Sequence, residues 1–218
     1  METSNRVNIF LNDRWEKLAS WLLMRQKGCM GRHKSYNRDD VLEKAMTLFW
    51  AKGFEGAHLS ELVEVTGIKR FSLYAEFGGK DGLFQEALEL YLQRALAVYD
   101  ATLKMEPYGL DNLRNYFKEM SYGDDYHGCF LINTLTEQNI ITSTAFEAAR
   151  QVIQRARALF LMNLQVAQED GEIGPDKDIE ALANLLSTLD SGLSIYGIVS
   201  PSDEEKDAIV AQALYLLS

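Results

Sequence analysis

The stretch that begins at Leu59 and ends at Phe77 constrains the fold more than any other part of the chain. It has the pattern of two short helices joined by one sharp turn. Leu59 and Leu62 recur at helical spacing in the first half, and Gly67 follows where the chain must turn. Glycine adopts the positive φ of such a turn without steric cost. Leu73 and Phe77 lie four residues apart and share the inward face of the second half. The stretch therefore predicts a helix-turn-helix.

The outward face of the second predicted helix has no apolar stripe to bury, and it begins with two cations. A hydroxyl and a phenol follow on or beside the same face. Such a helix fits the major groove of DNA, with its N-terminal residues at base edges and its flanks on phosphates. The residues expected to face DNA are Lys69, Arg70, Phe71, Ser72, Tyr74 and Ala75.

The net charge of −10 argues against DNA binding only until it is divided along the chain. Residues 1–29 carry 5 basic and 3 acidic groups, residues 30–82 carry 8 of each, and residues 83–218 carry 9 basic and 21 acidic groups. Phosphate neutralisation needs local cations, so the neutral segment can bind DNA while the acidic remainder is repelled from it. The simpler interpretation of the acid excess is a solvated surface that aids solubility.

A wider pattern surrounds the motif. Its parts follow one another without gaps and are Val41-Leu-Glu-Lys-Ala-Met-Thr-Leu-Phe49, Lys52-Gly-Phe54, Gly67-Ile68, Leu73-Tyr74, Phe77 and Lys80-Asp-Gly-Leu-Phe84. With these residues the segment resembles the DNA-binding domain of the TetR family of transcriptional regulators. The resemblance implies an all-α fold of about nine helices, in which a three-helix DNA-binding domain with a helix-turn-helix precedes a helical ligand-binding and dimerisation domain.

The implied domains divide the chain into three. Residues 1–33 form an N-terminal extension and basic arm, and residues 34–94 form the DNA-binding domain with its motif at 58–77. Residues 95–218 form the helical domain for ligand binding and dimerisation. In the extension, the apolar spacing over 13–26 is compatible with a short amphipathic helix. The first 29 residues are either an extension of uncertain order or the product of an upstream start, since Met30-Gly-Arg-His-Lys is a common beginning in the resembled family.

The sequence departs from the family pattern at four positions near the expected DNA contacts. His58 replaces a hydroxyl residue, Lys69 replaces the serine that caps the second helix, Glu76 replaces a histidine and Gly79 replaces a serine. Lys69 cannot accept the capping hydrogen bond, and Glu76 adds a negative charge near a phosphate contact. The resemblance implies phosphate contacts for Tyr74 and Lys80, and His58 can cap its helix or contact a phosphate.

Helical periodicity continues through the remaining chain, and no strand pattern appears. Asn37 is expected to cap a helix over 38–52, and one long helix is expected over about 80–103. Further helices are expected from Leu110 and from Cys129, from a capping box at 144–147, over 178–199, and after a cap at 202–205. The long helix leaves the DNA-binding domain and enters the second, so it could transmit movement between them.

The resemblance also implies a homodimer in which the last two helices of each subunit form a four-helix bundle. The alternative is that both helices simply close the core of one subunit. Dimerisation agrees with DNA recognition because paired reading heads match the half-sites of a palindromic operator.

A cavity for an unknown small-molecule ligand is expected in the second domain, lined by aromatic and Met side chains. Asn133 is the polar residue expected to orient the ligand, because its helix is otherwise apolar. The same aromatic residues could instead be plain core. The expected lining is Tyr99, Phe117, Met120, Phe130, Asn133, Phe160 and Tyr196.

Cys129 is the candidate for a different mechanism, a redox or electrophile sensor, because a thiolate at a helix N-terminus is favoured by the helix dipole. The nearby Asp124, Asp125 and His127 match no standard metal spacing, so no metal and no cofactor are expected. Phosphate-loop and nucleophile-elbow motifs are missing from the sequence, which argues against an enzyme.

Location and function follow from these observations. No membrane span and no export signal are recognised, so we expect a cytoplasmic protein without a membrane partner. The expected function is a DNA-binding transcriptional repressor that a small-molecule ligand releases from its operator. The two alternatives are the thiol sensor at Cys129 and a helical adaptor that has lost DNA binding.

Overall fold

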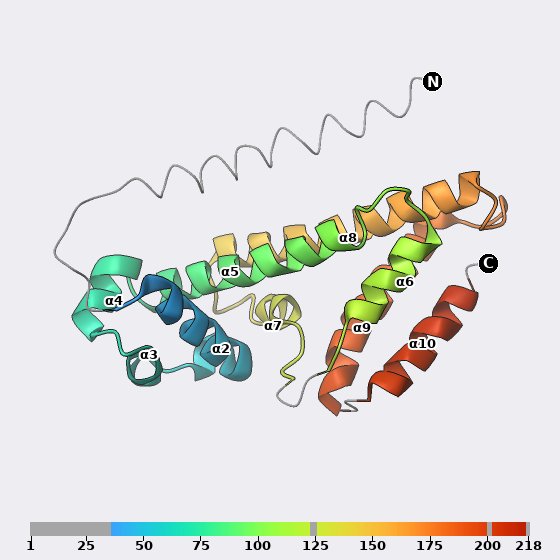
Figure 1. The fold of residues 1–218 in the computed structure, drawn as a ribbon. Helices are drawn as coiled ribbons and strands as arrows, with labels where there is room; N and C mark the ends of the chain where they lie inside the picture. The colour runs from blue at the N-terminus through green and yellow to red at the C-terminus, as the bar shows by residue number, and fades with distance from the viewer. Residues whose placement is uncertain (1–35, 123–125, 200–201, 217–218) are drawn as a thin grey trace, which may run out of the picture. The chain divides into compact units, whose positions relative to one another are not determined.

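The computed structural model describes residues 36–122, 126–199 and 202–216, and within these ranges it contains helices and no strand (Figure 1). The all-α prediction is therefore confirmed. The helices are α2 (Arg38–Gly56), α3 (Leu59–Thr66), α4 (Arg70–Phe77), α5 (Lys80–Ala101), α6 (Leu110–Glu119), α7 (Phe130–Thr136), α8 (Ser143–Glu169), α9 (Ile179–Val199) and α10 (Asp203–Tyr215). The helix and basic arm expected before residue 36, and Asp124 and Asp125, lie outside the described residues.

Helices α2, α3 and α4 form the predicted DNA-binding unit around the start of α5. The side chain of Asn37 accepts the backbone N–H of Asp39 at 2.9 Å, which confirms the predicted cap of α2. Gly53 has φ 72° and interrupts the helical path three residues before α2 ends at Gly56. The sequence predicts a helix that ends at residue 52, just before Gly53, whereas α2 continues to Gly56.

The helix-turn-helix is built as the sequence predicts. Leu62, Ile68 and Leu73 are buried, and Gly67 turns the chain with φ 68° between α3 and α4. The next turn is unusually tight, because a Cβ atom on Gly82 would lie 1.7 Å from the carbonyl oxygen of Phe77. This close approach fixes the direction in which α5 leaves α4.

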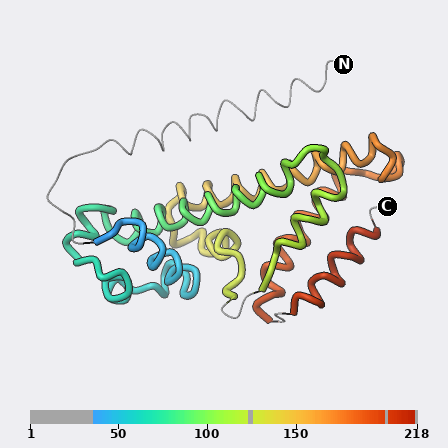
Figure 2. Tube along the Cα trace, viewed as in Figure 1, coloured from blue at the N-terminus to red at the C-terminus, as the bar shows by residue number. Residues whose placement is uncertain are grey.

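Helix α5 runs beside α8, so one helix extends from the helix-turn-helix into the rest of the bundle (Figure 2). It ends at Ala101, two residues before the predicted end. Asn163 on α8 holds the segment that follows, because its side-chain amide donates to Leu103 O at 2.9 Å and its oxygen accepts the N–H of Gly109 at 3.0 Å. The connection between α5 and α6 is thereby fixed against α8.

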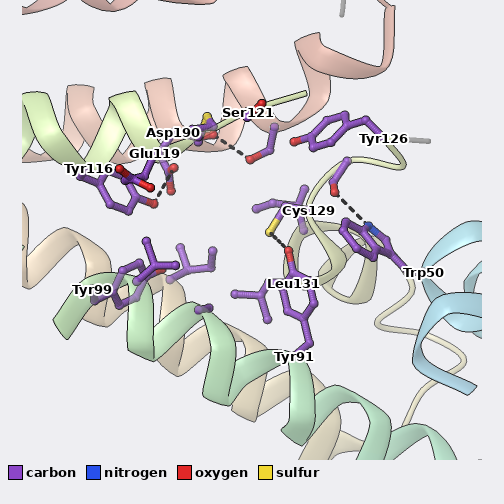
Figure 3. Close-up of a pocket in the computed structure, with 17 residues that line it drawn as sticks. Trp50, Tyr91, Tyr99, Tyr116, Glu119, Ser121, Tyr126, Cys129, Leu131 and Asp190 are labelled. Atoms are coloured by element: carbon purple, nitrogen blue, oxygen red, sulfur yellow. Dashed lines mark hydrogen bonds between the residues drawn. The ribbon is translucent and has the colours of Figure 1, made fainter. Parts of the chain in front are cut away.

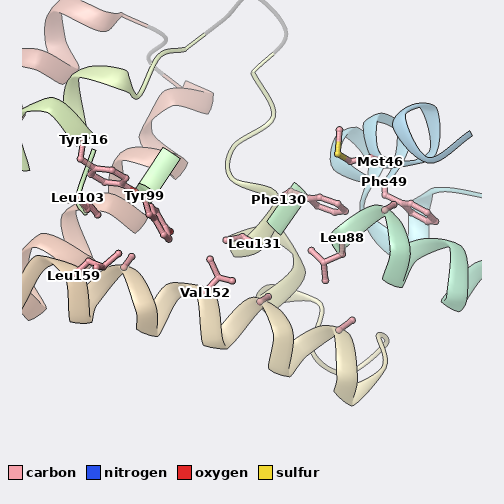
Figure 4. Close-up of a cluster of buried hydrophobic side chains, with 14 of the residues drawn as sticks. Met46, Phe49, Leu88, Tyr99, Leu103, Tyr116, Phe130, Leu131, Val152 and Leu159 are labelled. Atoms are coloured by element: carbon pink, nitrogen blue, oxygen red, sulfur yellow. The ribbon is translucent and has the colours of Figure 1, made fainter. Parts of the chain in front are cut away.

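Buried apolar side chains connect the DNA-binding unit with the helices beyond it (Figure 4). Phe49 of α2 packs edge-on against Phe84 of α5 at 5.0 Å between ring centroids, and Phe84 packs edge-on against Phe130 of α7 at 5.7 Å. The core then continues through Val152 and Leu159 on α8. Close packing of this kind transmits displacement, because it leaves little empty space to absorb it.

Two helix starts test the predicted caps. Helix α8 begins earlier than predicted, since the hydroxyl of Thr142 accepts the N–H of Ala145 at 3.2 Å and Thr144 lies inside the helix. The capping residue of this helix was therefore assigned two positions too late. Ser202 accepts the N–H of Glu205 at 3.4 Å, as predicted for α10.

Helix α9 is the one described helix that is long and apolar enough to cross a membrane by length and composition, with a mean hydropathy of 1.2. It packs against α8 and carries the buried carboxyl of Asp190. A carboxyl in hydrocarbon is costly, and α9 has a protein partner for its inner face. These contacts identify α9 as a helix of the bundle.

Candidate DNA-binding face and ligand cavity

The outward face of α4 presents the residues that the sequence predicts for DNA contact. Phe71 is 84% exposed and Tyr74 is 50% exposed, which is unusual for rings of this size. Lys69, Arg70 and Ala75 are also exposed, and Ser72 is partly exposed. The result is a short helix that begins beside two cations and buries only Leu73 and Phe77.

The departures from the family pattern have structural explanations. Lys69 occupies the N-cap of α4 without a side-chain cap, as its chemistry requires, so its ammonium extends outward beside Arg70. Glu76 accepts hydrogen bonds from Tyr36 Oη at 3.2 Å and from Arg38 Nε at 3.3 Å. Glu76 is therefore engaged within the protein, and Arg38 pairs with both Glu76 and Glu86.

His58 and Lys80 border the motif on its two sides. His58 is exposed at the N-cap of α3, where its backbone N–H donates to Glu61 at 3.4 Å. The ammonium of Lys80 donates to the carbonyl of Glu55 at 3.3 Å and lies 4.6 Å from the ring centroid of Phe54. Partial burial lowers the pKa of Lys80. Lys80 thus joins the start of α5 to the end of α2, and its phosphate contact stays a prediction.

A cavity of about 530 Å³ lies among α2, α5, α6, α7, α8 and α9 (Figure 3). Its wall is mostly apolar and aromatic, with few polar groups. It is lined by Trp50, Tyr91, Ala95, Val98, Tyr99, Tyr116, Glu119, Met120, Ser121, Tyr126, Gly128, Cys129, Leu131, Ile132, Ile153, Asp190 and Ser194. This size and composition are typical of sites for small organic molecules.

The predicted lining residues divide into two groups. Tyr99 and Met120 lie in the cavity wall. The other five do not lie there. Phe117, Phe130 and Phe160 are at most 1% exposed and pack in the core, which is the simpler alternative for such rings. Asn133 donates its amide to His127 O at 2.9 Å, and Tyr196 is 36% exposed on α9, so neither is placed to orient a ligand in this cavity.

Asp190 was missed by the sequence analysis. Its Oδ1 atom accepts the hydroxyl of Tyr116 at 2.9 Å. Burial raises the pKa of Asp190 from the usual 3.8 to about 6, and the hydrogen bond from Tyr116 partly opposes that rise. The available signal was a carboxylate in the middle of the apolar sequence of α9, well beyond Glu180 in its first turn. Tyr116 gave no such signal, because aromatic residues at helical spacing are usually core, and Tyr126 lies outside the helices.

Cys129 lies at the N-cap of α7, as predicted, and its Sγ atom accepts the hydroxyl of Tyr91 at 3.7 Å. Burial nevertheless raises the pKa of Cys129 above that of a free thiol, and the backbone N–H groups of Ile132 and Leu131 oppose this less strongly. The expectation that the helix end favours the thiolate is wrong for this environment, because desolvation is the larger effect.

Hydrogen bonds to Gly128 and Glu137 connect the cavity region to the DNA-binding unit. Trp50 belongs to α2, yet it lines the cavity and donates its indole N–H to Gly128 O at 2.9 Å (Figure 3). The carboxylate of Glu137, directly after α7, accepts the backbone N–H of Phe54 at 2.8 Å. A change at the cavity can therefore reach α2 directly.

An exposed cationic helix in a helix-turn-helix, joined to an α-helical body, is the arrangement of a DNA-binding protein. Residues 41–87 match the family model for bacterial regulatory proteins of the tetR family, and residues 109–197 match the model for a tetracyclin repressor-like C-terminal domain. The chain belongs to the TetR family, and it is a DNA-binding transcriptional regulator and not an enzyme.

Named relatives support the assignment. The chain is 35% identical to the HTH-type transcriptional repressor ComR of Escherichia coli (strain K12) over 87% of this chain and 93% of that protein. It is 32% identical to the regulator YezE of Bacillus subtilis (strain 168) over 72% of this chain and 84% of YezE. A cysteine mutant of the TetR family regulator CifR, solved with 26-base-pair operator DNA, is 29% identical with a TM-score of 0.74, over 86% of this chain and 100% of that one.

Proposed function

We propose that the protein is a cytoplasmic repressor that binds a palindromic double-stranded operator as a homodimer and is released by a small molecule in its cavity. The observation that carries this proposal is the position of Trp50, which belongs to a helix of the DNA-binding unit and also lines the cavity. Similarity to ComR, named as a repressor, and to CifR, solved with operator DNA, supports the assignment.

In the DNA-bound state α4 would enter the major groove. Arg70, in the first turn of α4, would reach a base edge or phosphate, and Lys69 and Tyr74 would contact the backbone. The exposed ring of Phe71 offers an apolar contact for a thymine methyl group. His58 and Lys80 would bind phosphates at the two sides of the motif.

The last two helices would form the dimer interface. Within the described residues, α9 and α10 expose large apolar side chains that a solvated surface does not require. These include Leu185, Ile195, Ile198, Val199, Ile209, Tyr215 and Leu216, each at least 36% exposed. Because exposed apolar surface favours association, these side chains support a two-fold dimer.

Ligand binding would shift the DNA-binding units through α2 and α5. A ligand in the cavity contacts Trp50 on α2 and the α5 side chains that line the wall, so it can favour a spacing of the two α4 helices that no longer matches the operator. Coupling of this kind is of order 1–3 kcal/mol in allosteric proteins.

The first test is binding to DNA from upstream of the protein's own gene, measured by fluorescence polarisation at roughly 50 and 200 mM salt. Wild-type binding should weaken with salt, and Arg70→Ala should abolish most of it. Arg114→Ala, in the body of the protein, is the matched control and should bind as wild type does. A folded dimer without salt-sensitive binding would instead support the adaptor alternative.

The dimer is tested with Ile195→Glu, which places a charge on the exposed face of α9, and with Ile140→Glu as control, since Ile140 is 42% exposed outside these helices. Sedimentation should show a monomer for Ile195→Glu and a dimer for the control. A dimeric Ile195→Glu protein would argue for another interface.

The thiol-sensor alternative is tested by Cys129→Ser. The raised pKa of Cys129 speaks against a reactive thiolate. We therefore expect the variant to respond to peroxide and electrophiles as wild type does. A response that is lost only in the variant would restore the sensor mechanism.

A further inference from the structure

The charged groups in the cavity wall have one sign. Asp190 and Glu119 line the cavity, and the described lining includes no Lys, Arg or His. A wall that carries only carboxyl groups favours a cationic ligand over an anionic one. An anion would lose its water of hydration beside carboxylates, with no base in the wall to compensate.

Aromatic rings line the same cavity as these carboxyl groups. Trp50, Tyr91, Tyr99, Tyr116 and Tyr126 come from α2, α5, α6 and the segment before α7, and together they supply most of the ring surface of the wall (Figure 3). Trp50 and Tyr91 lie 5.3 Å apart between ring centroids, and Tyr99 and Tyr116 lie 5.8 Å apart. The faces of such rings attract a cation, most strongly when water is excluded.

Two bases near the cavity, Lys206 and Arg155, do not line it. The buried ammonium of Lys206 donates to Met120 O and lies 3.1 Å from Asp207. Arg155 acts electrostatically on Tyr99 but does not line the cavity. The carboxyl of Asp190 accepts its hydrogen bond from a neutral group, the hydroxyl of Tyr116. A buried carboxylate is stable only when it is paired or protonated, and a ligand can supply the missing charge.

We propose that the cavity binds a lipophilic organic monocation, an ammonium or a related onium ion with aromatic or alkyl groups, whose charge pairs with Asp190 between the tyrosine rings. Glu119 adds long-range attraction at the wall, and the apolar side chains of α5 and α7 contact the body of the ligand. The assignment rests on the proposed function only in taking this cavity as the ligand site. It goes further in naming the charge and the chemical class.

The test uses three compounds of similar shape and different charge: tetraphenylphosphonium, triphenylphosphine oxide and tetraphenylborate. Benzyltrimethylammonium serves as a smaller cation. Binding to the full-length protein is measured by isothermal titration calorimetry near neutral pH. Both cations should bind saturably, the phosphonium about tenfold or more tightly than the neutral oxide, and the borate should not bind.

Variants locate the charge that is responsible. Asp190→Asn keeps an oxygen for Tyr116 and should weaken phosphonium binding by about tenfold or more while leaving binding of the oxide unchanged. Glu119→Gln, on an exposed residue that can be replaced without unfolding, should weaken phosphonium binding by a smaller factor. Asp111→Asn removes an equal charge from the exposed start of α6 and should leave binding unchanged.

Three results would overturn the assignment: no saturable binding of either cation, equal binding of the oxide and the phosphonium, or equal phosphonium affinity in wild type and in both cavity variants. Release of operator DNA is measured separately in the same samples. Phosphonium binding without release of DNA would contradict ligand-controlled repression but agree with the cation assignment. Release of DNA by the neutral oxide alone would agree with ligand-controlled repression but contradict the cation assignment.

Discussion

The carboxylate of Glu137 accepts the backbone N–H of Phe54 at 2.8 Å, and its second oxygen accepts the N–H of Glu55 at 3.4 Å. Glu137 follows α7 in the body of the protein, and Phe54 and Glu55 lie in the last turn of α2. One side chain thus binds two backbone groups of the DNA-binding unit, directly after the Gly53 interruption. Charge-assisted bonds of this kind are stronger than neutral ones.

Removal of this contact should loosen the DNA-binding unit from the body. For Glu137→Ala we expect the free energy of unfolding to fall by about 1–3 kcal/mol, because two amide groups lose a charged acceptor. The measurement is urea denaturation followed by circular dichroism. Glu147→Ala is the control, since Glu147 pairs with Arg150 on the surface and such pairs contribute at most about 1 kcal/mol. Equal losses in the two variants would contradict a special role for Glu137.

Phe71 should matter to DNA and not to stability. The ring is 84% exposed, so Phe71→Ala should change the free energy of unfolding by less than about 0.5 kcal/mol. If the ring contacts a thymine methyl group, operator binding should weaken by about 1–2 kcal/mol. Replacement of thymine by uracil in the operator removes this methyl group. It should therefore weaken binding of wild type and leave the affinity of the variant unchanged. An unchanged operator affinity would place Phe71 outside the interface.

Gly82 should tolerate no side chain. A Cβ atom there would lie 1.7 Å from the carbonyl oxygen of Phe77, and this neighbour is backbone that cannot rotate away. We expect Gly82→Ala to lower the free energy of unfolding by about 2 kcal/mol or more, through displacement of α5 from α4. Gly56→Ala is the matched control, because its new Cβ would meet Lys52 Cβ at an ordinary 3.5 Å. Similar melting temperatures for the two variants would refute this account.

The helix-turn-helix could be predicted because its information is local. The spacing of Leu62, Leu73 and Phe77, together with the turn at Gly67, predicts which faces are buried. All three side chains are buried in the structure. Helix ends were less certain where two hydroxyl residues compete for one cap, as at Thr142 and Thr144.

The cavity could not be predicted in the same way, since its wall combines residues that are distant in sequence. Trp50 and Asp190 come from α2 and α9, and periodicity does not reveal that they line one space. The same periodicity marks Phe117 and Phe160 as inward without separating core from wall, and the structure places both in the core.

Asp190 should also determine how stability depends on pH. The folded protein holds its pKa at about 6, above the usual 3.8 of the unfolded chain, so the folded state binds this proton more tightly. The stability contributed by protonation is complete below about pH 4 and is lost as the pH rises from about 4 to about 6. Asp190 interacts electrostatically with Tyr99, Tyr116, Tyr126 and Cys129, and burial raises the pKa of each, so none of these four groups ionises in this range.

Asp190→Asn should therefore stabilise the free protein above this range. At about pH 7.5 wild type carries a buried carboxylate that the amide replaces without charge, so we expect a gain of about 1–2 kcal/mol in the free energy of unfolding. The gain should disappear near pH 4, where wild type is protonated. Urea denaturation at several pH values measures the gain at high pH and its loss near pH 4. Asp111→Asn changes an exposed carboxyl and should show no such pH-dependent gain. A residue whose removal stabilises the protein and weakens cation binding would be kept for its ligand and not for the fold. Loss of stability in Asp190→Asn at both ends of the pH range would mean instead that the carboxyl serves the packing of α9.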